Sequence, residues 1–500
     1  LPRVTGKFCT VVVKMSAEDI EASDILKKGL RASDEGDAYA GTVGDVAAGA
    51  IKLEYKDNLS HEEARVLRRV LSTEGSLKKL KLIGVPLTVC EIVLKDHDDG
   101  RSSLEELELF AIENEGSEFS LKLSGIFGNL RVLNLSCNDI GDSFTRKIAD
   151  FLQNNSTLQE LGLWSNEISD EGATALATAL ERNSTLKRLA LTQNNLTSQA
   201  LLAFADALTT NSILERVELF EVDIEEEDVV ALFETDRYAD TFRRAYILWR
   251  QDYLPELTRL LREDRHCSEV SVDITDTVSK DHLRDFFDAI SANTTVRTLH
   301  FHPGGCTFDA LTDGLVSVLE RTTSLTHVQN LMDLDRDEAL IRTLDALRQN
   351  RSVTAFTMYA ETLTPAIATS VSELLATNNV LNSLSVCEHF EINSDELATV
   401  LEGLRKNYTL TKLMVAWDPD DEVEGVSEMV ELLERNARLL DRAVEFVRAG
   451  SAGIDDVEGA DALKKVRSSA GLVDRLQKLT GKAKDAVLLD IEDSLARLQS

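Results

Sequence analysis

A segment of 28 residues is repeated in tandem near the middle of the chain, and it constrains the fold more than any other feature. The stretch from Thr157 to Ser184 reads TLQELGLWSNEISDEGATALATALERNS, and the stretch from Thr185 to Ser212 reads TLKRLALTQNNLTSQALLAFADALTTNS. Tandem repeats of this length are typical of arrays in which each unit packs on its neighbours. We therefore expect the 500 residues to form an extended array rather than one compact core.

Each clear copy follows the pattern L-x-x-L-x-L-x-x-N-x-L, which begins at Leu130, Leu158 and Leu186. The alternating leucines of the first half predict a short strand with one buried face. The second half carries apolar residues at helical spacing and predicts a helix. The asparagine of the pattern is expected to be buried and to satisfy backbone groups at the turn. Stacked copies would then form a ladder, whose members are Asn138, Asn166 and Asn194.

The register extends in both directions and gives about fourteen candidate units between residues 50 and 437. Residues 1–49 are expected to cover the N-terminal end of the array, and residues 438–500 to form a helical C-terminal cap or tail. The last helical segment has an apolar stripe that is interpreted as part of this cap, with docking of a partner helix as the alternative. The stripe comprises Val487, Ile491, Leu495 and Leu498.

The repeats that begin at Leu130, Leu158 and Leu186 resemble leucine-rich repeats of the ribonuclease-inhibitor-like class, which are long and contain a helix. The resemblance implies an α/β fold, a leucine-rich repeat solenoid or horseshoe with an inner parallel sheet, outer helices and a helical C-terminal cap. The repeats are also similar to those of NOD-like innate immune receptors and of Ran GTPase-activating proteins.

Strand residues between the leucines point to the concave side of such a solenoid, where packing does not dictate their identity. One position in each unit, directly after the third apolar residue, often carries a large side chain. Its members predict a contact stripe for a protein partner, and they are Phe110, Trp164, Phe220, Leu248, His302 and Tyr359. The alternative is that these side chains lie against their neighbours on the sheet.

A second row, four positions earlier, places arginines on consecutive predicted strands. Arg188, Arg216 and Arg244 enter the candidate partner-binding set, because guanidinium groups can clamp carboxylates or a phosphopeptide. Ion pairing with nearby acids, such as Glu160 and Glu218, is the favoured interpretation of this row.

Composition excludes several classes of function. The net charge of −33 disfavours nucleic-acid binding, because a phosphate backbone requires a basic surface. No run of about 18 apolar residues is present, so membrane insertion is not expected. The six cysteines form no C-x-x-C pair, which favours reduced thiols in a cytoplasmic protein and no zinc site. No nucleotide-binding loop, metalloprotease motif or nucleophile elbow occurs, so no catalytic residue, cofactor or metal is assigned.

Asn-x-Ser/Thr triplets recur at the repeat junctions. We interpret them as turn and cap residues rather than as glycosylation acceptors. They begin at Asn155, Asn183, Asn195, Asn293 and Asn407.

These features predict a non-enzymatic scaffold that binds a protein partner on its concave face, because a rigid sheet presents side chains at little cost in entropy. The resemblance to NOD-like receptors implies a role in innate immune or regulatory signalling. The alternative function is that of a Ran-type GTPase-activating protein. That family has an acidic tail, whereas this C-terminal segment carries several lysines, namely Lys464, Lys465, Lys478, Lys482 and Lys484.

Overall fold

The computed structural model describes most of the chain after residue 50 and divides it into two compact units, Leu1–Ile247 (unit 1) and Leu248–Ser500 (unit 2). The described ranges are 51–56, 77–95, 104–114, 119–123, 125–220, 236–238, 240–275, 277–303, 309–333, 337–359, 363–386, 392–415, 423–450 and 456–498, with the positions 61, 64–65, 67–68, 222 and 232. The predicted N-terminal cap, residues 1–49, lies outside the described residues.

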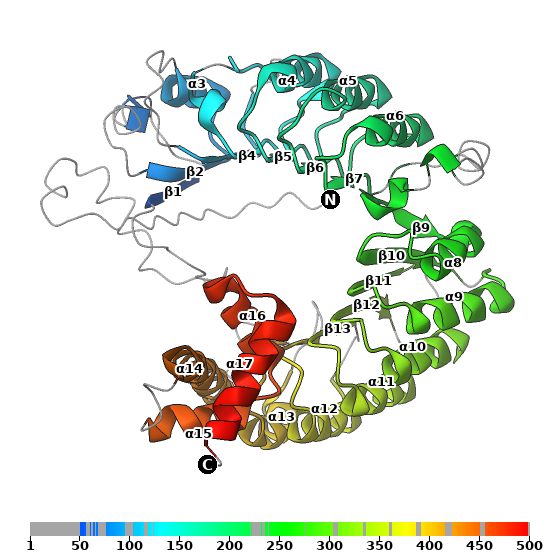
Figure 1. Ribbon diagram of the computed structural model, residues 1–500, viewed down its shortest axis with the longest axis vertical. Helices are drawn as coiled ribbons and strands as arrows, with labels where there is room; N and C mark the ends of the chain where they lie inside the picture. The colour runs from blue at the N-terminus through cyan, green and yellow to red at the C-terminus, as the bar shows by residue number, and fades with distance from the viewer. Residues whose placement is uncertain are drawn as a thin grey trace, which may run out of the picture. The chain divides into compact units, whose positions relative to one another are not determined.

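Unit 1 is built on a parallel sheet of eight strands whose spatial order follows their order in the chain (Figure 1). The strands are β1 (Ile51–Lys56), β2 (Leu77–Ile83), β3 (Glu106–Phe110), β4 (Val132–Asn134), β5 (Glu160–Gly162), β6 (Arg188–Ala190), β7 (Arg216–Glu218) and β8 (Ala245–Tyr246). The helices are α3 (Leu87–Leu94), α4 (Gly141–Asn154), α5 (Asp170–Leu180) and α6 (Ser198–Thr210). Short 3₁₀ turns are η2 (Gly125–Asn129), η3 (Asp236–Tyr238) and η4 (Thr241–Arg243).

Unit 2 contains a second parallel sheet, of seven strands, again in sequential order. The strands are β9 (Leu248–Arg250), β10 (Glu269–Ile274), β11 (Thr298–Pro303), β12 (His327–Asp333), β13 (Ala355–Tyr359), β14 (Ser383–Val386) and β15 (Lys412–Val415). The 3₁₀ turn η5 (Gln251–Tyr253) leads into α8 (Leu254–Arg262), and the following helices are α9 (Lys280–Ala292), α10 (Asp309–Arg321), α11 (Asp337–Gln349), α12 (Pro365–Thr377) and α13 (Ser394–Lys406). The C-terminal helices are α14 (Val426–Ala449), α15 (Val457–Val466), α16 (Ala470–Thr480) and α17 (Lys484–Arg497).

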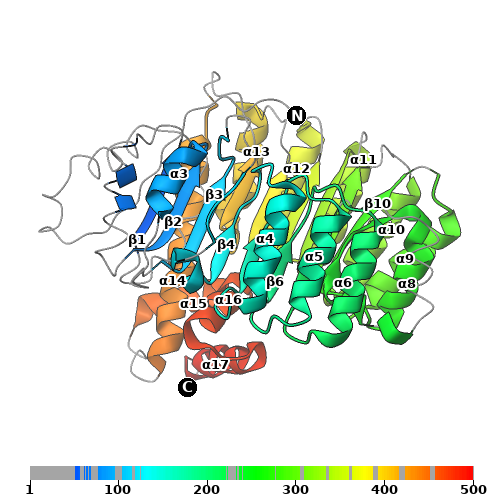
Figure 2. The ribbon, with the colours of Figure 1, turned by 90° about the horizontal axis from the view of Figure 1, so that it is seen from above.

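The leucines of the repeat pattern produce the two layers of each unit. Leu133, Leu161 and Leu189, one on each of β4, β5 and β6, are at most 2% exposed and point to the helix side of the sheet. The repeat helices form a row on that side, as α4, α5 and α6 do in Figure 2. The alternate strand residues are half-buried or exposed. The predicted α/β fold, a leucine-rich repeat solenoid with a parallel sheet, helices on one side and a helical C-terminal region, is therefore confirmed.

Buried asparagines join the ends of several repeat helices to the next strand, and we call them the junction asparagines. In Asn211, Nδ2 donates to the carbonyl oxygens of Leu180 (2.6 Å) and Asn183 (3.1 Å). Its Oδ1 accepts from the backbone N–H groups of Ile213 (2.8 Å) and Leu214 (2.7 Å). These bonds satisfy carbonyl groups that a helix leaves open at its C-terminus. The same arrangement is found at Asn183, Asn293, Asn350, Asn378 and Asn407.

The junction asparagines explain most of the Asn-x-Ser/Thr triplets. Asn183, Asn293 and Asn407 are at most 6% exposed and use both ends of their amide in the junction. Asn155 likewise accepts from the backbone N–H groups of Thr157 and Leu158. A turn role was predicted for these triplets, and the hydrogen bonds at these four positions agree with it.

A second ladder lies at the opposite end of the strands of unit 1. The Oδ1 atom of Asn166 accepts from the backbone N–H of Asn138 (2.8 Å), and Oδ1 of Asn194 accepts from that of Asn166 (3.0 Å). Their Nδ2 groups donate to leucine carbonyl oxygens of their own and the preceding repeat. The chain turns sharply beside each of these asparagines, with positive φ at five non-glycine residues: Cys137, Asp139, Ser165, Glu167 and Gln193.

The C-terminal helices form an apolar cluster of their own. Val487 and Ile491 of α17 are at most 3% exposed, and Leu495 and Leu498 pack against the same cluster, whose other members come from α14, α15 and α16. The apolar stripe of the last helix therefore faces this cluster, as the cap interpretation requires. Helix α14 runs through residue 437, so the last repeat and the C-terminal helices share one continuous helix.

Candidate protein-binding surface

The candidate surface is the side of the unit 1 sheet that faces away from the repeat helices, which we call the open face. Residues of β2 to β8 at alternate positions line it, with two or three residues from each of β2 to β7 and Tyr246 from β8. The hydrogen-bonded register continues past the short strands, because the N–H of Cys137 donates to Trp164 O (2.8 Å) and that of Ser165 to Thr192 O (3.0 Å). Trp164 and Thr192 are therefore neighbours on adjacent strands, as the repeat predicts.

Phe110 and Trp164 form a stacked pair on the open face. Their ring centroids are 6.3 Å apart, with 25° between the ring planes. The two residues stand two strands apart, about 10 Å at the backbone, so the rings lean toward each other across β4. Ser136 lies between them in the register and is only 4% exposed. Both rings are half-buried, and they retain exposed surface for contact.

Phe220 belongs to a second aromatic group at the other end of the open face. Its ring stacks on Tyr246 of β8, with centroids 5.7 Å apart and 21° between the planes. The guanidinium carbon of Arg216 lies 4.3 Å from the centroid of the Tyr246 ring. Arg216 also pairs through Nε with Glu218 (2.7 Å). Tyr246 is not among the predicted contact residues, although its position in the register is the equivalent of Glu218 one strand earlier.

The charges of the open face are neutralised within it. Lys79 pairs with Glu106 (2.8 Å), and Lys81 pairs with Glu108 (2.9 Å). Arg188 lies 3.8 Å from Glu160, and its side chain is 63% exposed. The predicted ion pairing of Arg188 and Arg216 is therefore observed, but Arg188 is the more loosely held of the two. The open face is an aromatic surface with balanced charges in a chain of net charge −33.

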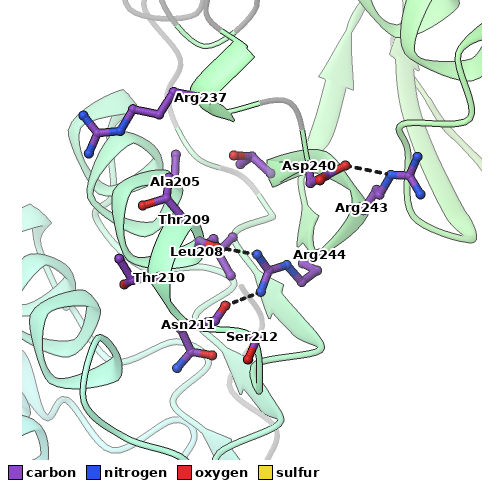
Figure 3. A pocket seen from close by; sticks show the side chains of 11 residues that line it. Ala205, Leu208, Thr209, Thr210, Asn211, Ser212, Arg237, Asp240, Arg243 and Arg244 are labelled. Carbon is purple, nitrogen blue, oxygen red and sulfur yellow. Dashed lines mark hydrogen bonds and ion pairs between the residues drawn. The ribbon is translucent and has the colours of Figure 1, made fainter.

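Arg244 does not share a row with Arg188 and Arg216 on the open face. Its guanidinium donates to the carbonyl oxygens of Leu208 and Asn211, at the C-terminal end of α6 (Figure 3). These two carbonyl groups are the acceptors that a junction asparagine would occupy in the next repeat. A long side chain can reach the helix terminus from a strand position, and sequence register does not reveal the direction it takes. Arg435 on α14 repeats the arrangement by donating to the carbonyl oxygens of Leu404 and Asn407.

A cavity of about 570 Å³ adjoins Arg244, between the end of α6 and the turns η3 and η4. Arg243 pairs with Asp240 (3.0 Å) on one side, and Arg237 pairs with Asp206 (2.7 Å) on another. Figure 3 shows the three arginines of this cavity pointing in different directions. The cavity is lined by Ala205, Leu208, Thr209, Thr210, Asn211, Ser212, Arg237, Asp240, Thr241, Arg243 and Arg244. Its cations are engaged separately, so the lining does not form a single anion site.

The remaining predicted contact residues belong to unit 2. Leu248 is half-buried and pairs with Ser271, whereas Arg250 is the residue that aligns with Asp273. Asp273 in turn aligns with His302 of the predicted stripe, so the register assigned to Leu248 relative to β10 is wrong by two residues. Tyr359 ends β13, and its side chain lies outside the described residues.

His302 lies half-buried in a polar part of the unit 2 sheet. Its ring stacks on His300, with centroids 6.4 Å apart. His300 in turn lies between Gln329 (Nδ1 to Oε1, 2.8 Å) and Glu269 (Nε2 to Oε1, 3.3 Å). Burial, and secondarily His300, lower the pKa of His302, while Asp273 opposes the shift. The corresponding face of unit 2 thus offers imidazole, amide and carboxylate groups rather than an aromatic surface.

Among the described residues, no group of three or more His, Cys, Asp or Glu side chains is arranged to hold a metal ion. No helix in that part of the chain combines the length and apolar character needed to cross a membrane.

The strand-helix repeats, the buried leucines and the two asparagine ladders define a leucine-rich repeat protein. A family model described as Leucine Rich repeat matches residues 129–143, 154–177 and 182–205, which are the repeats of unit 1 that contain Asn138, Asn166 and Asn194.

Several curated proteins resemble part of the chain. Tropomodulin-4 of Bos taurus is 33% identical over 110 residues, which is 21% of this chain and 31% of the relative. Tropomodulin-4 of Mus musculus and of Homo sapiens are each 34% identical over the same shares. The chain therefore spans about a third of the length of these curated relatives.

Two solved structures are also similar in part. One is Leiomodin-1 Actin-Binding Site 2, with 17% identity, a TM-score of 0.18, and coverage of 38% of this chain and 78% of that chain. The other is the tropomodulin C-terminal domain of Caenorhabditis elegans, with 16% identity, a TM-score of 0.23, and coverage of 38% and 95%. At these TM-scores the likeness carries no argument about function.

Proposed function

We propose that the chain is a non-enzymatic scaffold that binds a protein partner on the open face of unit 1. The observation that supports this most is the set of half-buried aromatic side chains, Phe110, Trp164 and Phe220, on a sheet face whose charges are already paired. Solvent-facing aromatic side chains beside neutralised charges are typical of protein contact surfaces.

The mechanism of binding is preorganisation. Parallel strands hold successive open-face residues about 4.8 Å apart. The ladder of Asn138, Asn166 and Asn194 fixes the turns that carry Trp164 and its neighbours. Little conformational freedom is then lost at the surface when a partner binds, so more of the contact energy appears as affinity.

The finer assignments belong to the same proposal. The repeat lengths support the ribonuclease-inhibitor-like class, and the resemblance to NOD-like receptors supports a role in innate immune or regulatory signalling. We place the principal contact on unit 1 and a secondary, polar contact on unit 2 at His302, with Leu248 and Tyr359 as further candidates. The wide spacing of the cysteines supports a cytoplasmic location.

The test is affinity capture from native lysate with three baits, read by mass spectrometry. The first is the wild-type chain, and the second carries Phe110→Ala, Trp164→Ala and Phe220→Ala. The third is a matched control with three exposed substitutions on the helix side of the same repeats: Gln153→Ala, Thr174→Ala and Glu181→Ala. We expect partners captured by the wild type and the control to be lost with the open-face variant. Equal capture by all three folded baits would contradict the proposal.

Two purified probes accompany the capture experiment. A GTP hydrolysis assay with Ran and related small GTPases tests the alternative, because a scaffold gives no acceleration whereas a GTPase-activating protein does. Actin, which the Leiomodin-1 fragment is described as binding, serves as a defined protein probe in sedimentation and anisotropy assays. Binding of actin that survives the open-face substitutions would assign the contact to another surface.

A further inference from the structure

The aromatic groups of the open face lean away from one strand and leave it between them. Trp164 of the β5 repeat stacks toward β3, on Phe110. Phe220 of the β7 repeat stacks in the opposite direction, on Tyr246 of β8. The strand between them, β6, carries the small side chains Ala190 and Thr192 at these levels.

The neighbouring open-face position on β5 is also small. Gly162 aligns with Ala190, and a Cβ added at Gly162 would lie 2.7 Å from Oδ1 of Asn134. That distance is far below van der Waals contact, so the side chain of Asn134 occupies the space a larger residue would need at Gly162. We call the strip formed by Arg188, Ala190 and Thr192 the β6 lane.

The dimensions of the lane suit one side chain. The strands on either side, β5 and β7, are separated by about 10 Å, which is twice the spacing of adjacent strands. An aliphatic or aromatic group placed over Ala190 and Thr192 would contact the Trp164 and Phe220 rings on its two sides. Aromatic faces and edges bind such a group through dispersion and, for a second ring, through quadrupole alignment.

The amino-terminal end of the lane adds a charge requirement. Arg188 is 63% exposed at its side chain, and its contact with Glu160 spans 3.8 Å. The other three ion pairs of the open face span 2.7–2.9 Å. Arg188 is therefore the open-face cation best able to donate two hydrogen bonds to a carboxylate of a partner. The net charge of −33 repels a strongly acidic partner, so the complement is a single carboxylate beside an apolar group.

We propose that the β6 lane receives a partner segment in which an apolar or aromatic side chain, seated between Trp164 and Phe220, is accompanied by one carboxylate that binds Arg188. The two groups of the partner are about one turn apart on a helix or two residues apart on an extended segment, given the reach of the arginine side chain. This inference rests on the proposed function and specifies the partner chemistry at the same surface.

The test uses a random 16-residue peptide library displayed on phage. Selection is on the wild-type chain, with depletion on the Phe110→Ala, Trp164→Ala and Phe220→Ala variant, so that open-face binders are retained. Individual synthetic peptides are then measured by fluorescence anisotropy. We expect the enriched sequences to combine an apolar residue with a single Asp or Glu at the stated spacing.

Two variants examine the lane directly. Thr192→Trp fills it and is expected to weaken binding of the selected peptides at least tenfold, whereas Thr178→Trp, on the exposed side of α5, leaves binding unchanged. Arg188→Gln is expected to weaken binding about fivefold for peptides that keep their carboxylate. It should have no further effect on peptides in which Asp is replaced by Asn or Glu by Gln.

The outcomes distinguish a failure of the β6 lane from a failure of the proposed function. If the open-face variant loses the peptides but folded Thr192→Trp binds as well as Thr178→Trp, the lane is overturned while the proposed function stands. Enrichment of basic or purely polar peptides also overturns the lane. If no peptide depends on the open face, both proposals fail for peptide partners. Circular dichroism verifies folding, and the Arg188→Gln cycle remains decisive should Thr192→Trp fail to fold.

Discussion

Units 1 and 2 share one framework and differ at the positions that the framework leaves free. Both alternate parallel strands with helices, and both use junction asparagines, such as Asn211 in unit 1 and Asn378 in unit 2. Each unit also has an arginine that binds carbonyl groups at a helix terminus, Arg244 at the end of α6 and Arg435 at the end of α13. Side chains therefore bind the open carbonyl groups at the ends of these helices in both units.

The strand ends of the two units are built differently. Strands β4 to β7 have three residues each, and after β4, β5 and β6 a ladder asparagine and a residue of positive φ form the turn. Strands β10 to β13 have five to seven residues. Among the described residues of unit 2, only Asp264 is a non-glycine residue with positive φ. In the repeats that have a turn asparagine, the strand is therefore short and ends in a sharp, hydrogen-bonded turn.

The sheet faces away from the helices differ most. Unit 1 presents Phe110, Trp164 and Phe220 with balanced charges, and unit 2 presents His300 and His302 among amide and carboxylate groups. Packing does not select these residues, so the two faces differ in the chemical groups that they present.

The largest effect is expected from breaking the shared framework. Asn211→Ala and Asn378→Ala each remove four hydrogen bonds to backbone groups in buried surroundings. At about 1 kcal/mol or more for each group left without a partner, the free energy of unfolding should fall by about 4 kcal/mol in both variants. Urea denaturation gives the magnitude, and hydrogen exchange read by mass spectrometry assigns it to a unit.

Asn195→Ala is the matched control, because this asparagine is exposed. We expect it to change stability by less than about 0.5 kcal/mol. A large loss at Asn378 with none at Asn211 would show that the two units do not depend on the same device.

The acid response should distinguish the units. His266 of unit 2 is buried, accepts a hydrogen bond from Nε1 of Trp249 (2.9 Å), and has its pKa lowered by burial from 6.5 to about 4. The folded state therefore binds fewer protons than the unfolded state between these values, so this contribution to stability is complete above pH 6.5 and is lost as the pH falls toward 4. At 1.36 kcal/mol per pKa unit, unit 2 should lose about 3 kcal/mol.

Urea denaturation at pH 7, 6, 5 and 4, combined with hydrogen exchange, measures this loss. His266→Gln keeps an acceptor for Trp249 without titrating, so it should flatten the slope for unit 2. The idea that acid acts through His266 fails if the slope is unchanged in that variant, or if unit 1 loses protection first.

The framework of buried leucines and asparagines could be predicted from the sequence because these residues recur with the period of the repeat. The leucines recur every 28 residues in the clear copies and keep one face buried, and the turn asparagines occupy one position in the pattern. The sequence located the free positions of unit 1, but it did not show which residues their side chains contact. The stacking of Phe110 on Trp164 spans two strands, and the direction of Arg244 depends on rotamers that a linear pattern does not contain.

The failure at Leu248 has a different cause. The unit that begins at Phe242 is 25 residues long by sequence, whereas its neighbours have 28 or 29. Strand β9 lies within this shortened unit and pairs Arg250 with Asp273, so a register carried on from the 28-residue repeats fails there. The same irregular unit concealed Tyr246, which no repeat pattern singles out. Register derived from a period is reliable only while the period is constant.

A moderate effect is expected from the terminal arginines. Arg244→Met and Arg435→Met remove charged donors from the carbonyl groups at the ends of α6 and α13, and each should lower the free energy of unfolding by about 2 kcal/mol. Arg→Lys at the same positions should recover part of the loss, because lysine keeps the charge without the planar fork. If Arg244→Met leaves stability intact and abolishes partner binding, Arg244 acts as the contact residue that the sequence suggested.

The smallest effects are expected at the free positions, and they decide whether unit 1 can use its open face for binding. Glu160→Gln removes an exposed partner of Arg188 and should change the free energy of unfolding by less than about 0.5 kcal/mol. His300→Ala in unit 2 breaks a half-buried chain from Glu269 to Gln329 and should cost about 1 kcal/mol. Both are read from urea denaturation at pH 7. A loss above 1 kcal/mol for Glu160→Gln would mean that the fold itself holds Arg188. The guanidinium would then be unavailable to a carboxylate of the partner. The β6 lane would still bind an apolar side chain between its aromatic rings, but it would no longer require a carboxylate beside it.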